Sequence, residues 1–264
     1  MEFLRKTSGA AVLVAPLLLS ALLTAPLRGQ DIRLLQKQAR ESVFLLRVFD
    51  SSGELLGTGT GFLVDGGMLV TNHHVIDSAA RVDVMLGEKR AIPAAGIIAK
   101  DRDNDLALLR VPAIKRRPLP LETSRTLEPG DRVVVLGSPL GLSGTVSDGI
   151  VAALRPNGLG EEGFFKQPLL QITAPVSPGS SGSPVLNAKG AVVGVVVSQF
   201  SAGQNLNFAI PADSLLKLIA RSQSSSLERR LDGSEVFRWS YLRNLGISAA
   251  FFVAIFLAFR KMRD

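Results

Sequence analysis

The 264-residue sequence contains no cysteine, only two histidines, one tryptophan and one tyrosine. Without cysteine the chain has no disulfide framework, so a packed core has to stabilise it. Two adjacent histidines without a thiol do not supply the ligands of a catalytic zinc site. We therefore expect neither a metal ion nor another cofactor.

The formal net charge is +7, but the basic residues form no stripe with interleaved aromatic side chains of the kind that binds nucleic acid. Most of the excess lies in residues 1–30 and 226–264, beside apolar segments. Positive charge in that setting reports membrane topology. We therefore expect no nucleic-acid partner.

Residues 1–30 have the pattern of a targeting segment. Arg5 and Lys6 precede the apolar run Ala10–Leu27, which is typical of a secretory signal. No clean small-x-small triplet ends the run, so an uncleaved N-terminal membrane anchor is the alternative. Pro16 and Pro26 argue against a buried core helix here.

A second apolar run, Leu245–Phe259, is followed directly by basic residues. It predicts a single transmembrane helix over 241–260, with a polar linker at 223–240 and a basic cytoplasmic tail at 261–264. An amphipathic helix in the membrane plane is the alternative. The protein would contact membrane lipid through this helix, in the cell membrane, with the rest of the chain on the extracytoplasmic side.

The middle of the chain has the pattern of an all-β fold. Residues 31–42 have helical spacing and predict a short leading helix. From Val43 short apolar runs alternate with turn residues, which predicts a barrel or a sandwich. A closing helix is expected over Pro211–Arg221. The predicted strands are Val43–Phe49, Thr60–Val64, Met68–Thr71, Val82–Leu86, Leu106–Val111, Arg132–Leu136, Thr145–Leu154, Leu169–Thr173, Ser183–Leu186, Ala191–Ser198 and Asn205–Ile210.

Glycine alternates with threonine from Gly57 to Gly61, which suggests a nucleotide-binding loop. The dinucleotide fingerprint, however, needs a third glycine where this chain has Phe62, and a helix where it has a strand pattern. We interpret the segment as a glycine-rich strand with close backbone neighbours.

The segment Ser177–Pro184 is a turn of small residues between two apolar runs. Gly179 can adopt backbone angles closed to other residues, so the amides that follow it can face one concavity. Ser181 would then be a nucleophile, with the amides of Gly179 and Ser181 as its oxyanion hole. Composition alone would predict an ordinary loop, because turns of glycine, serine and proline are common in β proteins.

A nucleophilic serine needs a base, and this sequence offers only His73 and His74. Asp105 directly precedes an apolar strand and would be held rigidly enough to orient the histidine. Its alternative role is that of a turn or cap residue. Asp101 and Asp103 are interpreted as solvated turn residues.

Five motifs follow one another along the chain: Thr71–Val75, Asp105–Leu108, Gly137–Gly141, Pro178–Pro184 and Asn207–Pro211. In this order they resemble the high-temperature-requirement (HtrA/Deg) branch of the trypsin-like serine proteases. The resemblance covers about residues 42–215 and implies an all-β fold of two six-stranded antiparallel β-barrels. It implies a protease domain over 31–222, with barrel one at about 42–113 and barrel two at about 119–214. The family's regulatory PDZ domain is not expected, because linker and membrane-helix patterns follow the last motif.

The resemblance assigns a role to each matching residue. His74 would be the general base, Asp105 would orient it, and Ser181 would be the nucleophile. The amides of Gly179 and Ser181 would form the oxyanion hole, with the Ser180 amide nearby. The family usually has Gly-Asn-Ser-Gly-Gly-Pro at the nucleophile, where this chain has Ser180 for asparagine and Ser183 for the second glycine of the Gly-Gly pair.

The substrate pocket is expected to be lined by residues just before the nucleophile loop and by a later strand. These residues are Ala174, Pro175, Val176, Val196, Val197 and Ser198. None of them is acidic, so cleavage is expected after small or medium aliphatic residues rather than after Lys or Arg.

The predicted function is a membrane-anchored serine endopeptidase that hydrolyses unfolded or membrane-proximal polypeptides. The main alternative is a catalytically silent peptide-binding module on the same fold. A purely structural, membrane-tethered β-domain would leave the order of the motifs as coincidence.

Overall fold

The computed structural model describes residues 29–111, 114–138, 144–159, 166–197, 206–222 and 229–230. The predicted membrane helix over 241–260, the basic tail, and residues 1–28 of the predicted targeting segment lie outside these ranges. Among the described residues, no helix has both the length and the apolar character needed to cross a membrane.

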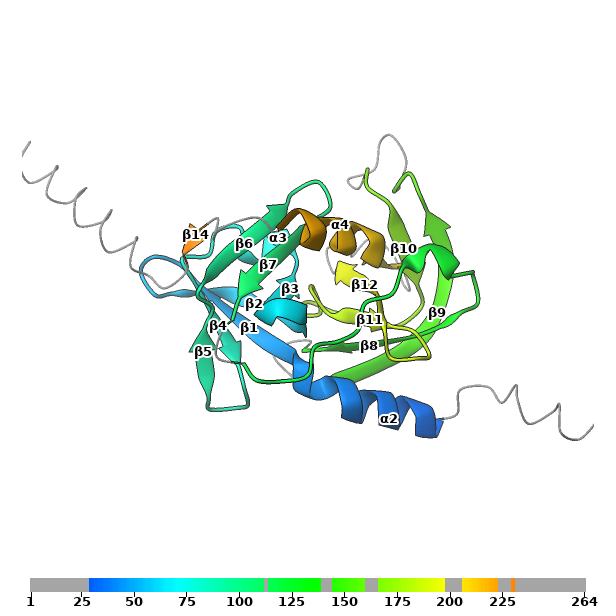
Figure 1. Ribbon diagram of the computed structural model, residues 1–264, viewed down its shortest axis with the longest axis horizontal. Coiled ribbons are helices and arrows are strands. Elements are labelled where there is room, and N and C mark those ends of the chain that lie inside the picture. Colours follow the sequence, from blue (N-terminus) through cyan, green and yellow to red (C-terminus); the bar gives the residue numbers. More distant parts are fainter. Residues whose placement is uncertain are drawn as a thin grey trace, which may run out of the picture.

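Two β-structures lie side by side, with one helix below them and another above (Figure 1). The N-terminal one is an eight-stranded sheet whose strand order is β14-β6-β7-β3-β2-β1-β4-β5. Its strands are β1 (Val43–Phe49), β2 (Leu55–Val64), β3 (Met68–Thr71), β4 (Arg81–Met85), β5 (Ala91–Pro93), β6 (Gly96–Asp101), β7 (Leu106–Arg110) and β14 (Arg229–Arg230).

The prediction of six strands in a closed first barrel needs correction. Two short strands, β5 and β14, form the edges of this sheet, and β4 and β6 do not pair with each other. Instead, the connection between β5 and β6 joins the part of the sheet that contains β4 to the part that contains β7. The Ala94 amide donates to Val82 O on β4 (2.8 Å), and the Ala95 amide donates to Arg110 O on β7 (2.8 Å).

The C-terminal structure is a closed barrel of six antiparallel strands, as predicted. Around the barrel the order is β10-β13-β12-β11-β8-β9. The strands are β8 (Arg132–Gly137), β9 (Thr145–Arg155), β10 (Leu169–Ile172), β11 (Pro184–Leu186), β12 (Val192–Val197) and β13 (Asn207–Pro211).

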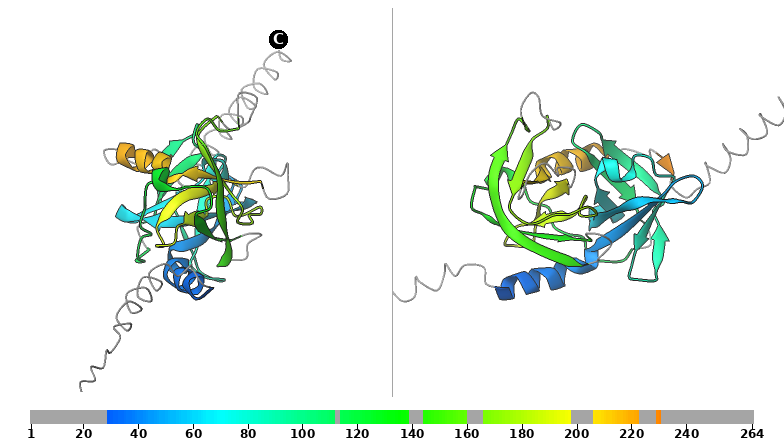
Figure 2. Two further views of the ribbon diagram at one scale, coloured as in Figure 1. Left: turned by 90° about the vertical axis from the view of Figure 1, so that its right-hand side faces the viewer. Right: turned by 180° about the vertical axis from the view of Figure 1, so that it is seen from behind.

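The closing helix lies over the seam between the two β-structures, and the leading helix runs along the C-terminal barrel, as the views from the side and from behind also show (Figure 2). Helix α2 (Gly29–Ala39) and the 3₁₀ turn η1 (Arg40–Ser42) lead into β1, which confirms the predicted leading helix. Helix α4 (Ala212–Ser222) confirms the predicted closing helix and packs against β6, β7, β12 and β13. The remaining short helices are η2 (Asp65–Gly67), α3 (His73–Ile76) and η3 (Ser124–Thr126).

Three apolar clusters form the core. One fills the N-terminal sheet and one fills the C-terminal barrel. The third joins Phe62 and Leu108 of the N-terminal sheet to Leu136 of the barrel, together with Leu35 of α2 and Leu215 of α4. Strand β12 contributes valines to this third cluster and to the cluster of the C-terminal barrel. It is therefore buried on both faces, which explains its nearly unbroken run of valine. The seam between the sheets is a packed core that holds the two halves in a fixed relation.

Candidate active site

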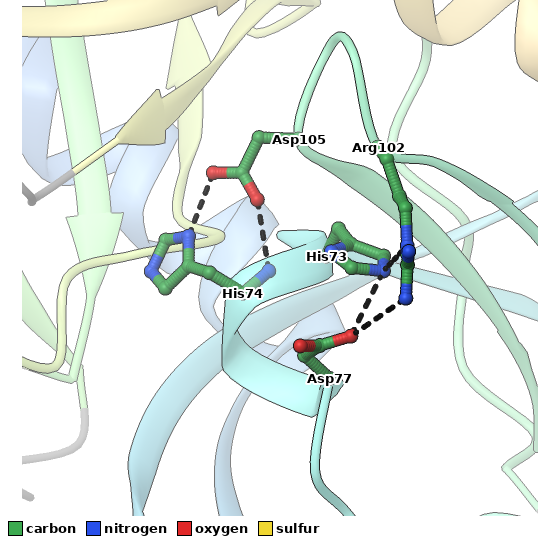
Figure 3. Close-up of polar contacts among 5 residues, drawn as sticks. All are labelled: His73, His74, Asp77, Arg102 and Asp105. Atoms are coloured by element: carbon green, nitrogen blue, oxygen red, sulfur yellow. Dashed lines mark hydrogen bonds and ion pairs between the residues drawn. The ribbon is translucent and has the colours of Figure 1, made fainter. Parts of the chain in front are cut away.

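His74 lies in α3, the short helix that begins directly after β3 and Asn72. Its ring Nδ1 is 2.6 Å from Asp105 Oδ2, and its backbone amide donates to Asp105 Oδ1 (2.8 Å; Figure 3). Each carboxylate oxygen of Asp105 is thus occupied by a different group of one histidine. Since an ionised carboxylate can only accept hydrogen bonds, Nδ1 carries the proton and Nε2 is left as an acceptor.

Asp105 has a backbone φ of +51°, and it is the one non-glycine residue with a positive φ in the described ranges. This conformation is uncommon for a residue with a side chain. The surrounding backbone holds it there, because its carbonyl accepts from Asn72 Nδ2 (3.0 Å) and from the His73 amide (3.2 Å). The segment around His74 therefore fixes both the main chain and the side chain of Asp105.

Ser181 completes a line of hydrogen-bonding groups across the seam. His74 Nε2 lies 3.1 Å from Ser181 Oγ, and Ser181 is 7% exposed. The structure therefore brings His74, Asp105 and Ser181 together, although 107 residues separate the histidine from the serine. In the tautomer set by Asp105, Nε2 is ready to accept the serine hydroxyl proton.

The residues before Ser181 form a β-turn. The Ser180 amide donates to Ser177 O (2.8 Å), and Gly179 at the third position has a φ of +91°. Proline at the second position and a positive φ at the third define a type II turn. Within the described part of the chain, the amides of Gly179 and Ser181 meet no acceptor. The Ser180 amide, which the sequence places near the oxyanion hole, is committed to the turn.

Ser183 does not crowd these amides. Its side chain is buried, and its hydroxyl lies against the backbone of Gly137, where an added Cβ would collide with it. Among the described residues, this hydroxyl has no hydrogen-bond partner. The departure from the family pattern at this position therefore affects packing below the loop rather than the amides of Gly179 and Ser181.

The second histidine, His73, points toward two charged side chains, Asp77 and Arg102, apart from the contact between His74 and Asp105 (Figure 3). Its Nε2 lies 3.3 Å from Asp77 Oδ1 and accepts from Arg102 Nε at 3.4 Å. Arg102 in turn lies 3.5 Å from Asp77. His73 therefore joins α3 to the turn that precedes Asp105.

The residues expected to line the substrate pocket divide into two groups. Ala174, Val196 and Val197 are buried, and their side chains contribute to the apolar clusters of the core. Pro175 is exposed and Val176 is half-buried. Ser198 lies outside the described residues. In the ranges the structure covers, no three His, Asp or Glu side chains are grouped so that they could hold a metal ion.

The sequence profile of the trypsin-like peptidase domain matches residues 59–195, about half of the chain. The chain belongs to the trypsin-like peptidase family. The match runs from Gly59 in β2 to Val195 in β12, and it includes His74, Asp105 and Ser181.

Two curated relatives of this trypsin-like peptidase come from bacteria. An anti-sigma-I factor, RsgI9, of Acetivibrio thermocellus is 33% identical over 174 residues, which cover 66% of this chain and 24% of the relative. A probable periplasmic serine endoprotease, DegP-like, of Hahella chejuensis is 34% identical over 181 residues, covering 67% and 38%. The chain thus spans about a quarter to two fifths of the length of these relatives.

Among solved structures, the HtrA-type protease AlgW with a tripeptide aligns with a TM-score of 0.63 and 26% identity. The alignment covers 72% of this chain and 62% of AlgW. This similarity agrees with the HtrA/Deg branch that the five sequence motifs indicate.

Proposed function

We propose that this trypsin-like peptidase is a serine endopeptidase with Ser181 as nucleophile, His74 as general base and Asp105 as the residue that orients His74. The observation that carries the proposal is the line of contacts from Asp105 Oδ2 through His74 to Ser181 Oγ, at 2.6 and 3.1 Å. The amides of Gly179 and Ser181, beside this line and without acceptors in the described ranges, would form the oxyanion hole.

In the proposed reaction, Ser181 Oγ attacks the carbonyl carbon of the peptide while its proton moves to His74 Nε2. The negative charge that develops on the carbonyl oxygen is stabilised by the amides of Gly179 and Ser181. The protonated His74 then gives its proton to the leaving amine as the C–N bond breaks. Water, activated by the same histidine, releases the acyl group, and Asp105 stabilises the imidazolium in both steps.

The substrate class is proposed to be unfolded polypeptides, cleaved after small or medium aliphatic residues. The support is the absence of an acidic side chain in the residues from Ala174 to Val176, which enter the loop that carries Ser181. Pro175 and Val176 retain exposed surface and are the described residues that we propose to meet substrate.

We also propose that the peptidase domain lies on the extracytoplasmic side of the cell membrane, attached through the helix predicted over 241–260. The support is the apolar and basic pattern of the sequence and the relative named periplasmic. After an alkaline wash of membranes the full-length protein should stay in the pellet. Its release into the supernatant would contradict the anchor.

The activity is tested by incubating the full-length chain with fluorescein-labelled β-casein and identifying the fragments by mass spectrometry. We expect cleavage after aliphatic residues by the wild type and its loss in Ser181→Ala. Ser222→Ala is the matched control, because its hydroxyl donates to Ile219 O at the far end of α4. Casein that binds wild type without being cut would favour the catalytically silent peptide-binding module.

A further inference from the structure

Thr60 lies on β2, in the glycine-rich segment, and is fully buried directly beneath the loop that carries Ser181. The neighbouring glycines allow this close approach. A Cβ added to Gly59 would lie 2.6 Å from a methyl group of Val75 and 3.5 Å from Ser181 O. The sequence pattern identifies the strand correctly but gives no signal that its threonine faces Ser181.

Three hydrogen bonds join Thr60 to the loops around the site. Its amide donates to Ser181 O (2.8 Å), and its hydroxyl donates to Gly179 O (2.8 Å). The same hydroxyl accepts from the Ser138 amide (3.1 Å). A threonine hydroxyl has one proton and two lone pairs, so it can make both of its bonds at once.

The two carbonyls that Thr60 holds lie on either side of the Ser181 amide along the chain. Fixing Gly179 O and Ser181 O fixes the peptide groups that flank this amide. It also holds the Cα from which Ser181 Oγ extends toward His74. We infer that Thr60 is a positioning residue, which aims the Ser181 amide and hydroxyl for the proposed reaction without touching substrate.

The same residue connects Ser181 to β3, the strand that leads into the helix of His74. Thr71, near the end of β3, donates from its hydroxyl to Thr60 O (2.8 Å). Gly182 adopts a φ of +85°, and a Cβ there would collide with this same carbonyl of Thr60. The 3.1 Å separation of His74 Nε2 and Ser181 Oγ is therefore set across a short, fully buried path through Thr60 and Thr71.

Valine has nearly the shape of threonine but lacks the hydroxyl. In Thr60→Val the buried Ser138 amide and the partly buried Gly179 carbonyl lose their partner, and each can recover a hydrogen bond only by moving. Such movement would shift the peptide groups around Ser181. Thr60→Ser keeps the donor and the acceptor, and should therefore keep the geometry.

This inference rests on the proposed function, and it is tested on the full-length chain with a fluorophosphonate probe and labelled β-casein. Active sites are counted by labelling to completion, and rates are expressed per labelled site. For Thr60→Val we expect the labelling rate and kcat to fall about tenfold, since loss of a direct oxyanion donor costs 10²–10³ and this effect is indirect. KM should change less than about twofold, because the substrate is not contacted.

Thr60→Ser should restore both rates to within about twofold of wild type. Thr123→Val is the control for loss of a threonine hydroxyl, because the Thr123 hydroxyl donates to Asp213 of α4 and not to the loop that carries Ser181. It should lower the melting temperature and leave the rate per site unchanged. If Thr60→Val does not fold, Thr71→Val, which removes only the bond to Thr60 O, should lower the same rates several-fold.

The outcomes separate this inference from the function on which it rests. A folded wild type that does not label overturns the proposed function and this inference with it. Wild-type labelling with an unchanged rate per site in Thr60→Val, or in Thr71→Val if that is the variant that folds, overturns the positioning role alone. A lower melting temperature with no change in rate per site would leave Thr60 a purely structural residue.

Discussion

At the scale of single residues, the site depends on a few side chains whose partners are fully specified. Asp105 offers one carboxylate oxygen to the His74 ring and the other to the His74 amide. This double contact places the ring proton on Nδ1 and orients the ring so that Nε2 faces Ser181. The neighbouring His73 has different partners, Asp77 and Arg102, so two adjacent histidines have different structural roles.

Ser183 is a residue that stability measurements can isolate. Its buried hydroxyl has no partner among the described residues, and such a group costs about 1–3 kcal/mol. Ser183→Ala keeps the backbone bonds of the loop and removes this cost. We expect the free energy of unfolding, measured by urea denaturation, to rise by about 1 kcal/mol.

Ser42→Ala is the comparison for this prediction. The Ser42 side chain is also buried, but its hydroxyl donates to Arg117 O. Its loss should lower the free energy of unfolding by about 1 kcal/mol. A decrease of similar size in Ser183→Ala would contradict our account of the Ser183 hydroxyl.

At the scale of elements, helix α4 ties the two β-structures to each other. Near its start, Asp213 accepts from Thr123 Oγ1 (2.8 Å), from the Ser124 amide (2.9 Å) and from the Ser124 hydroxyl. At its end, Arg221 donates to Asp101 Oδ2 (2.7 Å), at the end of β6 and four residues before Asp105. The helix therefore supports the turn that presents Asp105 to His74.

Asp213 and Asp101 both have lowered pKa values. For Asp213, burial works to raise the pKa, but the hydrogen bonds from Ser124 and Thr123 and the nearby Arg125 outweigh it. For Asp101, burial also works to raise the pKa, but the hydrogen bonds from Asn104 and the contact with Arg221 lower it by more. Asp101 is thus an ion-paired residue with a 9% exposed side chain, and its interpretation as a solvated turn residue was wrong.

The Asp213 contacts predict a pH-dependent stability. Because the folded pKa is below the unfolded value of about 3.9, the stabilisation is complete above that value and is lost as the pH falls through the folded pKa. Asp213→Asn should lower the free energy of unfolding by on the order of 2 kcal/mol at pH 7. The gap to wild type should shrink below about pH 4.

The measurement is thermal and urea unfolding of both proteins between neutral and acidic pH. Asp65→Asn, at an exposed position in η2, is the matched control and should show no gap at any pH. A gap between Asp213→Asn and wild type that stays constant down to strongly acidic pH would show that the ionised carboxylate is not the stabilising species.

At the scale of the whole molecule, much of the fold follows from the sequence pattern, because short apolar runs bounded by turn residues are typical of strands. Strands β1 and β3 begin and end as predicted, and β8 to β13 are displaced by at most two residues. The missed elements are the strands β5, β6 and β14, the helix α3 and the 3₁₀ turns η2 and η3; β14 lies where the sequence predicts a linker. Strand β5 and helix α3 have three and four residues, which is too short for a periodic pattern. Strand β14 has two residues and lies at the edge of the sheet, where it pairs with β6.

The site shows the same division. The nucleophile loop, the histidine pair and Asp105 stand out because their residue types and order are those of serine-protease chemistry. The commitment of the Ser180 amide to a turn and the contact of Thr60 with Ser181 depend on which segments meet across the seam. The burial of Val196 and Val197 likewise follows from β12 being covered on both faces.

The central claim is that His74 activates Ser181, and intact-mass analysis of the full-length chain after fluorophosphonate treatment tests it most directly. We predict one adduct on the wild type, located on Ser181 by peptide mapping, formed with loss of fluoride as the Oγ–P bond is made. Ser181→Ala and His74→Ala should both lose it, and Ser222→Ala should keep it. A folded wild type without an adduct, or an adduct that persists in Ser181→Ala, would contradict the account.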